Sequence, residues 1–167
     1  MNLFPPKLLD LSRDTLEAFR QAGLRATAAE SCTGGLIAGL LTEIAGSSDV
    51  VGRTFVTYSN QAKQEVLGVP AAVLEAVGAV SAETVTAMAE GALRACGADA
   101  DIAVAVSGVA GPGGGSAEKP VGTVYIAVAR RGEETEAGRH HFPGDRAEVR
   151  LRTVETALEL LRARISR

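Results

Sequence analysis

The 167-residue sequence contains no tryptophan, and aromatic residues make up only 4% of it. Four phenylalanines and two tyrosines are too few for a stacking platform that would bind nucleic-acid bases. Basic charge is not in excess either, because the formal net charge is −3. A weakly acidic chain creates no field that would attract DNA or an anionic membrane. We therefore expect neither nucleic acid nor a membrane as a partner.

The sequence also lacks long apolar runs and clusters of cysteine and histidine. No apolar run approaches the roughly 20 residues of a membrane-spanning helix, and the N-terminus does not follow the pattern of a secretory signal. The two cysteines, Cys32 and Cys96, form no CxxC pair, and only two histidines could join them as zinc ligands. We expect a cytoplasmic protein with reduced thiols that uses no metal and no cofactor.

Apolar residues are plentiful, at 46% of the chain, and they predict one folded domain over residues 1–167. Helix-like and strand-like patterns alternate along it. The patterns predict an α/β fold, a three-layer α/β/α sandwich whose central, mostly buried sheet has about five strands. Helices are expected at 7–22, 34–45, 61–67, 70–77, 81–96 and after Asp145; strands at 24–29, 50–58, 102–106, 121–129 and 134–142.

The last helix has the clearest signals. Asp145 and Glu148 form a D-x-x-E capping pattern, as Ser81 caps an earlier helix. An apolar stripe with spacings of three and four residues follows it: Leu151, Val154, Leu158, Leu161 and Ile165. We expect a homo-oligomer, and this stripe would allow a surface for self-association.

The first candidate for chemistry is the segment AESCTGG at 29–35, between a predicted strand and a predicted helix. Free backbone N–H groups at the start of a helix favour an anion or a developing oxyanion. Ser31 or Thr33 lies near this start. Plain helix capping explains the same residues, because Ser and Thr are common at that position anyway.

The second candidate is the segment SGVAGPGGGS at 107–116, which follows the buried strand 102–106 and contains five glycines. Glycine lets the backbone approach a ligand closely. The segment matches neither G-x-G-x-x-G nor the Walker pattern, and a flexible connection is the alternative interpretation. Since ligands of open α/β sheets bind beyond the carboxyl ends of strands, the two segments are predicted to border one pocket.

The third candidate is Lys63, at the end of the segment YSNQAK. Only three of the 17 basic residues are lysines, and a lysine after a strand is most often a solvated surface residue. However, an ammonium group can lose its proton when it is desolvated, whereas a guanidinium group effectively cannot. Lys63 with Ser31 would form a serine–lysine pair of nucleophile and base, which Tyr58 could assist. Cys32 is the rival nucleophile, although a buried structural thiol is the simpler interpretation.

With these three segments in order, the sequence resembles the CinA C-terminal domain family, the nicotinamide-nucleotide amidases. The resemblance is carried by AESCTGG at 29–35, TYSNQAKQEVLGV at 57–69, SGVAGPGGGSAEKPVGTVYIAV at 107–128 and FPGDR at 142–146. It runs from about residue 9 to residue 161. It implies an α/β/α fold and hydrolysis of the carboxamide of nicotinamide mononucleotide. Longer members carry an additional N-terminal domain, and this sequence resembles the stand-alone form.

Together with the residue patterns, the resemblance implies a set of roles. Ser31 is expected to attack the amide carbonyl, with Lys63 as general base, directly or through Tyr58. Backbone amides around Thr33 to Gly35 are expected to hold the oxyanion. The residues expected to bind the substrate are Thr33, Gly34, Gly35, Ser107, Gly111, Gly113, Gly114, Lys119 and Arg146.

The sequence departs from the family pattern in two places. Arg53 stands where a second glycine is usual, which raises the question of whether it changes a pocket wall. Ser107 replaces a usual threonine and keeps the hydroxyl group. Two alternative functions stay open: a non-catalytic module that binds a pyridine nucleotide, related to competence and damage-inducible proteins, and a hydrolase of another small amide.

Overall fold

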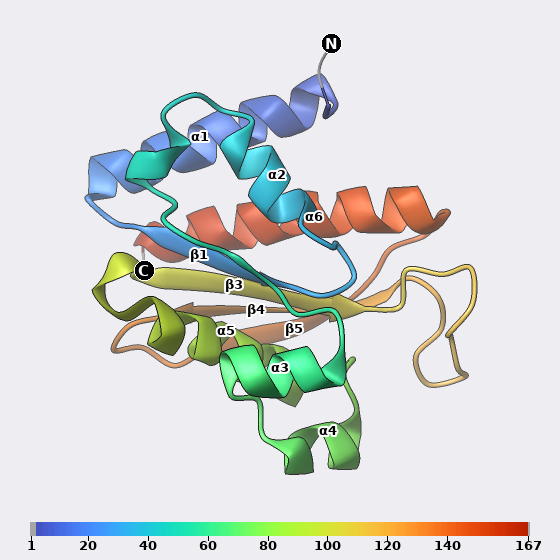
Figure 1. Ribbon diagram of the computed structural model, residues 1–167. Helices are drawn as coiled ribbons and strands as arrows, with labels where there is room; N and C mark the ends of the chain where they lie inside the picture. Colours follow the sequence, from blue (N-terminus) through green and yellow to red (C-terminus); the bar gives the residue numbers. More distant parts are fainter. Residues whose placement is uncertain (1–2, 167) are drawn as a thin grey trace.

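The computed structural model describes residues 3–166 and confirms a three-layer α/β/α architecture around a five-stranded sheet (Figure 1). The strand order is β2-β1-β3-β4-β5, in which β1 pairs in parallel with β2 and β3, whereas β4 and β5 continue the sheet antiparallel. The strands are β1 (Ala26–Glu30), β2 (Phe55–Val56), β3 (Ile102–Gly108), β4 (Thr123–Arg130) and β5 (Glu136–His141).

Helices cover both faces of this sheet. One face carries α1 (Pro6–Ala22), α2 (Leu36–Thr42) and α6 (Arg146–Ala163), and the opposite side carries α3 (Asn60–Leu67), α4 (Ala71–Val77) and α5 (Ala82–Cys96) (Figure 1). Short 3-10 turns occupy Ser47–Asp49, Gly97–Asp99 and Arg164–Ser166.

The two faces of the sheet differ in side-chain size. In β3, the bulky residues Ile102, Val104 and Val106 pack into the core that contains α1, α2 and α6. The alternate residues are alanines that belong to the core around α5, as are the alanines of β4. Small side chains let α5 lie close to the sheet. Gly91 of α5 is equally close to α3, since an added Cβ would lie 2.0 Å from the carbonyl oxygen of Leu67.

The predicted helix caps are confirmed. The Ser81 hydroxyl accepts a hydrogen bond from the Thr84 amide at 3.2 Å, and Asp145 and Glu148 form a complete capping box at the start of α6. The predicted edge position of the polar segment 134–142 is also confirmed by β5.

Two predicted elements are too long. The segment 50–58 pairs as a strand only at Phe55–Val56, with one isolated bridge at Val51. Between these points the Thr27 hydroxyl donates to the Arg53 carbonyl at 2.9 Å, so that a side chain replaces a ladder hydrogen bond. The helix predicted at 34–45 spans only α2, because Gly34 and Gly35 have left-handed φ values of 58° and 99°.

The apolar stripe of α6 is not a surface for self-association, and that prediction is wrong. Val154, Leu158 and Leu161 are fully buried in the core of the same chain. The ends of the stripe, Leu151 and Ile165, are partly buried against that core. The stripe exists because α6 packs on the sheet, and a homo-oligomer would need a different surface.

Candidate active site

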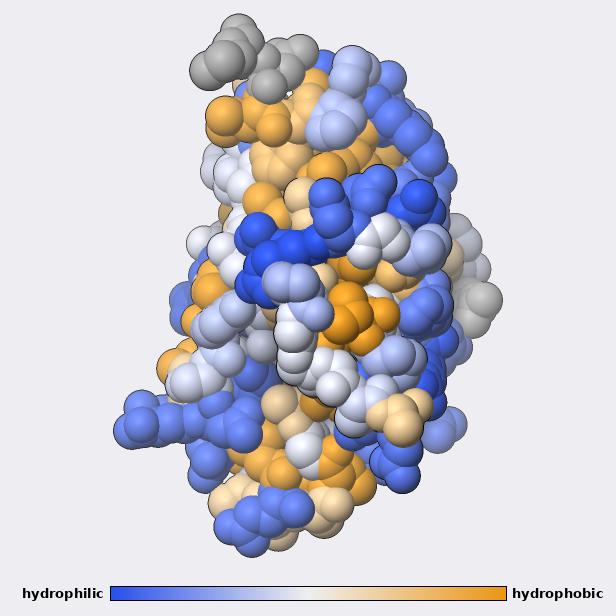
Figure 2. All heavy atoms as spheres, turned by 90° about the vertical axis from the view of Figure 1, so that its right-hand side faces the viewer, coloured by the Kyte–Doolittle hydropathy of each residue, from blue (hydrophilic) through white to orange (hydrophobic). Residues whose placement is uncertain are grey.

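The carboxyl ends of β1, β2 and β3 meet at one edge of the sheet because these strands are parallel. A pocket of about 190 Å3 lies there, and Figure 2 views the molecule from this side, where hydrophilic, pale and hydrophobic residues mix. The described residues that line the pocket are Ser31, Cys32, Tyr58, Lys63, Ala79, Val80, Ser107, Gly108, Ala110 and Arg146. The first and second candidate segments therefore do border one pocket.

Ser31 and Lys63 are in direct contact. The Lys63 Nζ atom lies 3.1 Å from the Ser31 Oγ atom, and it also donates to the carbonyl oxygens of Thr57 at 2.8 Å and Tyr58 at 3.4 Å. Lys63 is only 1% exposed and Ser31 only 8%. The N-terminus of α3 is capped by Ser59, which fixes the helix turn that carries Lys63. The pair predicted from the sequence thus meets at hydrogen-bond distance.

Burial lowers the pKa of Lys63 from its ordinary value of 10.5, because the ammonium form loses its hydration. A neutral Lys63 amine still has two N–H groups for the carbonyls of Thr57 and Tyr58. Its lone pair is then available to accept the Ser31 hydroxyl proton. The geometry and the lowered pKa together suit a general base.

Cys32 lies beside Ser31 in the pocket, and burial raises the pKa of its thiol to about 11. A thiol with this pKa stays protonated near neutral pH, and the protonated form is a poor nucleophile. The site therefore favours the Ser31 hydroxyl, with its adjacent base, over the rival cysteine.

Tyr58 and Arg146 form the outer wall of the pocket. The Tyr58 side chain is 61% exposed, and its hydroxyl oxygen accepts from Arg146 Nη2 at 3.1 Å. Arg146 Nη1 donates to the carbonyl oxygen of Gly111 at 2.7 Å. Lys63 is held by the backbone carbonyl of Tyr58 rather than by its phenol. A proton relay through the Tyr58 hydroxyl is therefore not needed, because Lys63 reaches Ser31 directly.

The other predicted substrate-binding residues divide into two groups. Ser107 is buried at the end of β3 and lines the pocket, and Ala110 and Arg146 border both this pocket and an adjoining one of about 600 Å3. The described residues that line these two pockets do not include Gly111, Gly113, Gly114 or Lys119. Lys119 instead donates to the Val77 carbonyl oxygen at 2.9 Å, at the end of α4.

The turn between β1 and α2 is held by a carboxylate that the sequence analysis missed. The Glu30 side chain is completely buried and accepts hydrogen bonds from the Thr33 hydroxyl at 2.6 Å and the Gly35 amide at 3.0 Å. The Gly34 amide donates to the Ser31 carbonyl oxygen at 3.0 Å. The amides of Gly34 and Gly35, expected to hold an oxyanion, are therefore already engaged within the turn.

Arg150 of α6 is a second residue that the sequence analysis missed. Its Nε and Nη2 atoms donate to the carbonyl oxygens of Cys32 at 3.1 Å and Thr33 at 2.9 Å. Arg150 lies more than a hundred positions from this turn in the sequence, so no local pattern pointed to it. Glu30 had a usable signal, since a helix whose N-cap residue is a glycine has no capping side chain and needs an acceptor from elsewhere.

Arg53, the departure from the family pattern, points away from the site. Its guanidinium donates to the Ala95 carbonyl oxygen at 3.2 Å and pairs with Asp99 at 3.3 Å, at the C-terminal end of α5. It is not among the described residues that line the pocket of Ser31. The arginine therefore makes a contact between the segment before β2 and the C-terminal end of α5, and it does not form a pocket wall.

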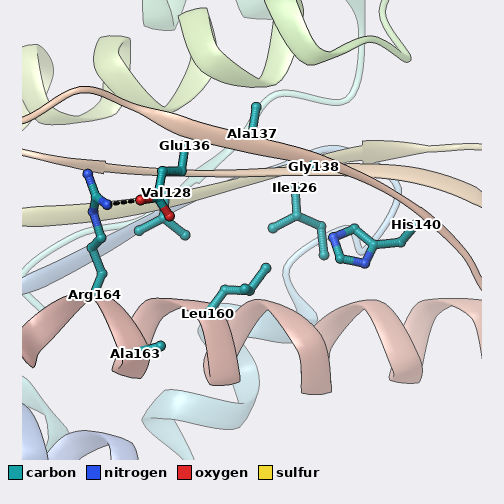
Figure 3. A pocket seen from close by; sticks show the side chains of 9 residues that line it. All are labelled: Ile126, Val128, Glu136, Ala137, Gly138, His140, Leu160, Ala163 and Arg164. Atoms are coloured by element: carbon teal, nitrogen blue, oxygen red, sulfur yellow. Dashed lines mark hydrogen bonds and ion pairs between the residues drawn. The ribbon is translucent and has the colours of Figure 1, made fainter. Parts of the chain in front are cut away.

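A separate pocket of about 220 Å3 lies between β4, β5 and α6 (Figure 3). It combines apolar walls with an ion pair between Arg164 and Glu136, and it contains none of the predicted site residues.

Within residues 3–166, no three His, Cys, Asp or Glu side chains are grouped closely enough to hold a metal ion. The helices in the same range are all too short or too polar to cross a membrane.

Fold, strand order and the Ser31–Lys63 pair define an α/β domain with a serine–lysine site. The model of the CinA C-terminal domain family matches residues 9–165, and the chain belongs to this family. A structure of the competence/damage inducible protein CihA from Agrobacterium tumefaciens superimposes with a TM-score of 0.93 at 50% identity, covering 100% of both chains. A CinA superfamily protein from Klebsiella pneumoniae gives 0.90 at 38% identity, covering 95% of this chain and 98% of the other.

Among curated relatives, the chain is 51% identical to the nicotinamide-nucleotide amidohydrolase PncC of Enterobacter agglomerans over 153 residues, which is 92% of each protein. It is 52% identical to a CinA-like protein of Syntrophobacter fumaroxidans over 145 residues. That match covers 87% of this chain but only 34% of the relative. The chain thus spans nearly all of one kind of relative and about a third of the other.

Proposed function

We propose that this chain hydrolyses the carboxamide of nicotinamide mononucleotide, releasing nicotinic acid mononucleotide and ammonia in pyridine nucleotide recycling. The observation that carries the proposal is the buried contact of 3.1 Å between Ser31 and Lys63. It occurs in a chain that is 51% identical, over nearly its whole length, to a protein named as a nicotinamide-nucleotide amidohydrolase. A desolvated lysine in contact with a serine hydroxyl provides a base for a nucleophile, and the binding of a nucleotide alone does not require such a pair.

The reaction begins with proton transfer from Ser31 to the neutral amine of Lys63. The Ser31 Oγ atom attacks the carboxamide carbon, and a tetrahedral intermediate forms with the negative charge on the former carbonyl oxygen. Lys63, now an ammonium group, gives its proton to the amide nitrogen, and ammonia leaves as the C–N bond breaks. The product of this half-reaction is an ester between Ser31 and the nicotinic acid moiety.

The second half-reaction repeats these steps with water. Lys63 accepts a proton from the water molecule, whose oxygen attacks the ester carbonyl. Collapse of the second tetrahedral intermediate returns the proton from Lys63 to Ser31 Oγ and releases the carboxylic acid, which loses its own proton to water. The same two residues therefore serve both halves, and the scheme needs no group that the chain does not supply.

The Cys32 amide is the donor assigned to the oxyanion, because Cys32 lines the pocket whereas Thr33 is fully buried and does not line it. Within residues 3–166 the Cys32 amide donates to no other residue, whereas those of Ser31, Gly34 and Gly35 are engaged. Loss of one donor of this kind costs about 3 kcal/mol of transition-state stabilisation.

The remainder of the substrate fits the two adjoining pockets. The pyridine ring enters beside Ser107, in the smaller pocket of about 190 Å3. The ribose phosphate extends past Ala110 and Arg146 into the larger pocket of about 600 Å3. Arg146 lies between them, and its fork of N–H donors matches a phosphate dianion. Lys119 is left out of this site because it is not among the described residues that line either pocket.

The direct test is ammonia release from nicotinamide mononucleotide by the wild-type protein and by Ser31→Ala. The proposal expects the variant to lose at least about a thousandfold in kcat, as removal of a nucleophile does elsewhere. Ser48→Ala, an exposed serine in the turn Ser47–Asp49, is the matched control and should keep full activity. Undiminished turnover by a folded Ser31→Ala protein would refute the nucleophile.

The same assay separates the alternatives. If the wild-type protein binds the mononucleotide without releasing ammonia, the chain is a non-catalytic binding module. If nicotinamide without its ribose phosphate is hydrolysed as fast as the mononucleotide, the chain is a hydrolase of another small amide.

A further inference from the structure

We propose that Glu30 is a positioning residue for Ser31: its buried carboxylate fixes the β1–α2 turn that aims the nucleophile, and Arg150 of α6 binds two carbonyl oxygens of the same turn. The proposal rests on the proposed role of Ser31 as nucleophile. Neither residue lines the pocket in the described part of the chain, so both act through the turn and not on the substrate.

The first observation is that Glu30 has four hydrogen-bond partners and that all are donors. Its Oε2 atom accepts from the Thr33 hydroxyl and from the amides of Gly35 and Ile37, the last at 3.1 Å. Its Oε1 atom accepts from the Ala38 amide at 2.9 Å. The carboxylate thus satisfies the free N–H groups at the start of α2, where Gly35 provides no side chain.

The second observation is that Ser31 directly follows Glu30 and has little freedom. Its amide donates to the Val106 carbonyl at 3.1 Å, which continues the ladder between β1 and β3. Its own carbonyl accepts from the Gly34 amide inside the turn. Strand β3 therefore fixes one side of Ser31, and the turn bound by Glu30 fixes the other.

The third observation is that Arg150 binds the carbonyl oxygens of Cys32 and Thr33 from α6. These two carbonyls lie in the peptide planes that carry the amides of Thr33 and Gly34. Glu30 therefore holds amides at the α2 end of the turn, and Arg150 holds the carbonyls of the two residues that follow Ser31. The oxyanion donor and the serine hydroxyl are set by one rigid turn, and misplacement of reacting groups by about 1 Å can cost a hundredfold in rate.

The test uses Glu30→Gln, which keeps the shape of the side chain. Because its amide group has only one oxygen, the NH2 group replaces an acceptor and lies against an N–H or O–H donor of the turn. We expect kcat to fall by between about tenfold and a hundredfold, with KM changed less than about threefold, since the pocket walls are intact. Ser12→Ala is the matched control: the Ser12 hydroxyl donates to the Leu40 carbonyl at the other end of α2. It should lower thermal stability and leave kcat unchanged.

A second readout keeps this test separate from the choice of substrate. Sulfonylation of Ser31 by phenylmethylsulfonyl fluoride, followed by mass spectrometry, measures the reactivity of the hydroxyl without any nucleotide. If the wild-type protein is labelled but does not hydrolyse the mononucleotide, the proposed function fails and the labelling rates still test Glu30. A wild-type Ser31 that is not labelled would overturn both the nucleophile and its positioning.

Equal kcat and equal labelling rate in folded Glu30→Gln and wild-type proteins would overturn the proposal. If Glu30→Gln does not fold, kcat of Arg150→Met tests the proposal instead. This variant removes both hydrogen bonds from Arg150 to the turn and should also lower kcat. Arg150→Lys should then restore part of kcat, since an ammonium group can bind one of the two carbonyls. Full activity of Arg150→Met would overturn the proposal in that case.

Discussion

At the scale of single residues, the property that matters most is that Lys63 can exist as a neutral amine. Arginine in its place would keep the positive charge but would not release a proton near neutral pH. We expect Lys63→Arg and Lys63→Met to lose at least about a thousandfold in kcat for ammonia release. Equal activity of Lys63→Arg and wild type would contradict the role of Lys63 as a base.

The hydroxyl of Tyr58 is predicted to matter much less. Its hydrogen bond goes to Arg146, and Lys63 contacts only the backbone carbonyl of Tyr58. We expect Tyr58→Phe to reduce kcat by less than about tenfold, because the lost hydrogen bond to the Arg146 guanidinium lies at a solvent-exposed side chain. A loss as large as that of Lys63→Met would instead show that the phenol carries the proton.

The lowered pKa of Lys63 predicts how activity and stability depend on pH. kcat/KM should rise with pH and level off at an apparent pKa below 10.5, because only the neutral amine acts as a base. Between the folded pKa and 10.5, the unfolded chain binds more protons at Lys63 than the folded chain does. The free energy of unfolding therefore increases with pH across that window.

Urea unfolding of wild-type and Lys63→Met proteins at several pH values measures the second effect. The stability of the wild type relative to the variant should grow as the pH rises towards 10.5. A difference that stays constant with pH would show that Lys63 titrates alike in the folded and unfolded chains.

Residue types near the site could be predicted from the sequence better than their hydrogen-bond partners. The scarcity of lysine singled out Lys63, and the strand ends placed Ser31, Ser107 and Lys63 at one edge. Lys119 follows the glycine-rich loop just as closely, yet its amine binds the Val77 carbonyl, 42 positions away in the sequence. Such a partner depends on where α4 lies, which no local pattern specifies.

At the scale of elements, Gly91 controls the distance between α5 and α3, and α3 carries Lys63. A Cβ at position 91 would lie 2.0 Å from the Leu67 carbonyl, so Gly91→Ala must push the two helices apart. We expect it to destabilise the fold by about 1–3 kcal/mol, despite the better helix propensity of alanine. Activity should fall as well, because Leu67 lies one turn from Lys63.

Thermal unfolding provides the measurement for Gly91→Ala, with Gly113→Ala as the stability control. An added Cβ at Gly113 meets nothing within 4 Å. The midpoint should fall by about 2–4 °C for each kcal/mol at this chain length in the first variant and stay near the wild-type value in the second. Equal midpoints for both variants would contradict the close contact of α3 and α5.

Elements with capping residues were predictable, and elements formed by long-range contacts were not. The starts of α5 and α6 follow from Ser81 and from the Asp145 and Glu148 box. Strand β2 is shorter than its β-branched sequence indicates because the Thr27 side chain, rather than its backbone, binds the Arg53 carbonyl. The turn before α2 likewise depends on Glu30, whose role appears only when the strand and the helix are placed together.

At the scale of the whole molecule, substrate binding should raise thermal stability, because a ligand that binds only the folded chain stabilises it. Ser31→Ala permits the measurement without turnover. Nicotinamide mononucleotide at a hundred times its Kd should add about 2.7 kcal/mol, or roughly 5–11 °C in Tm. Nicotinamide riboside at the same concentration should give a smaller shift, since it lacks the phosphate assigned to Arg146. Equal shifts would contradict that assignment.

The parallel and the antiparallel half of the sheet contribute different parts of the site, and this affects how the substrate of such a protein can change. The parallel strands β1, β2 and β3 and the helix after β2 supply the reactive groups, whereas the segment 109–122 that joins β3 to β4 borders the site from the antiparallel half. A connection between antiparallel neighbours can vary in length without altering strand register elsewhere. Exchange of that segment is therefore a route to new amide substrates that leaves the nucleophile and its base untouched.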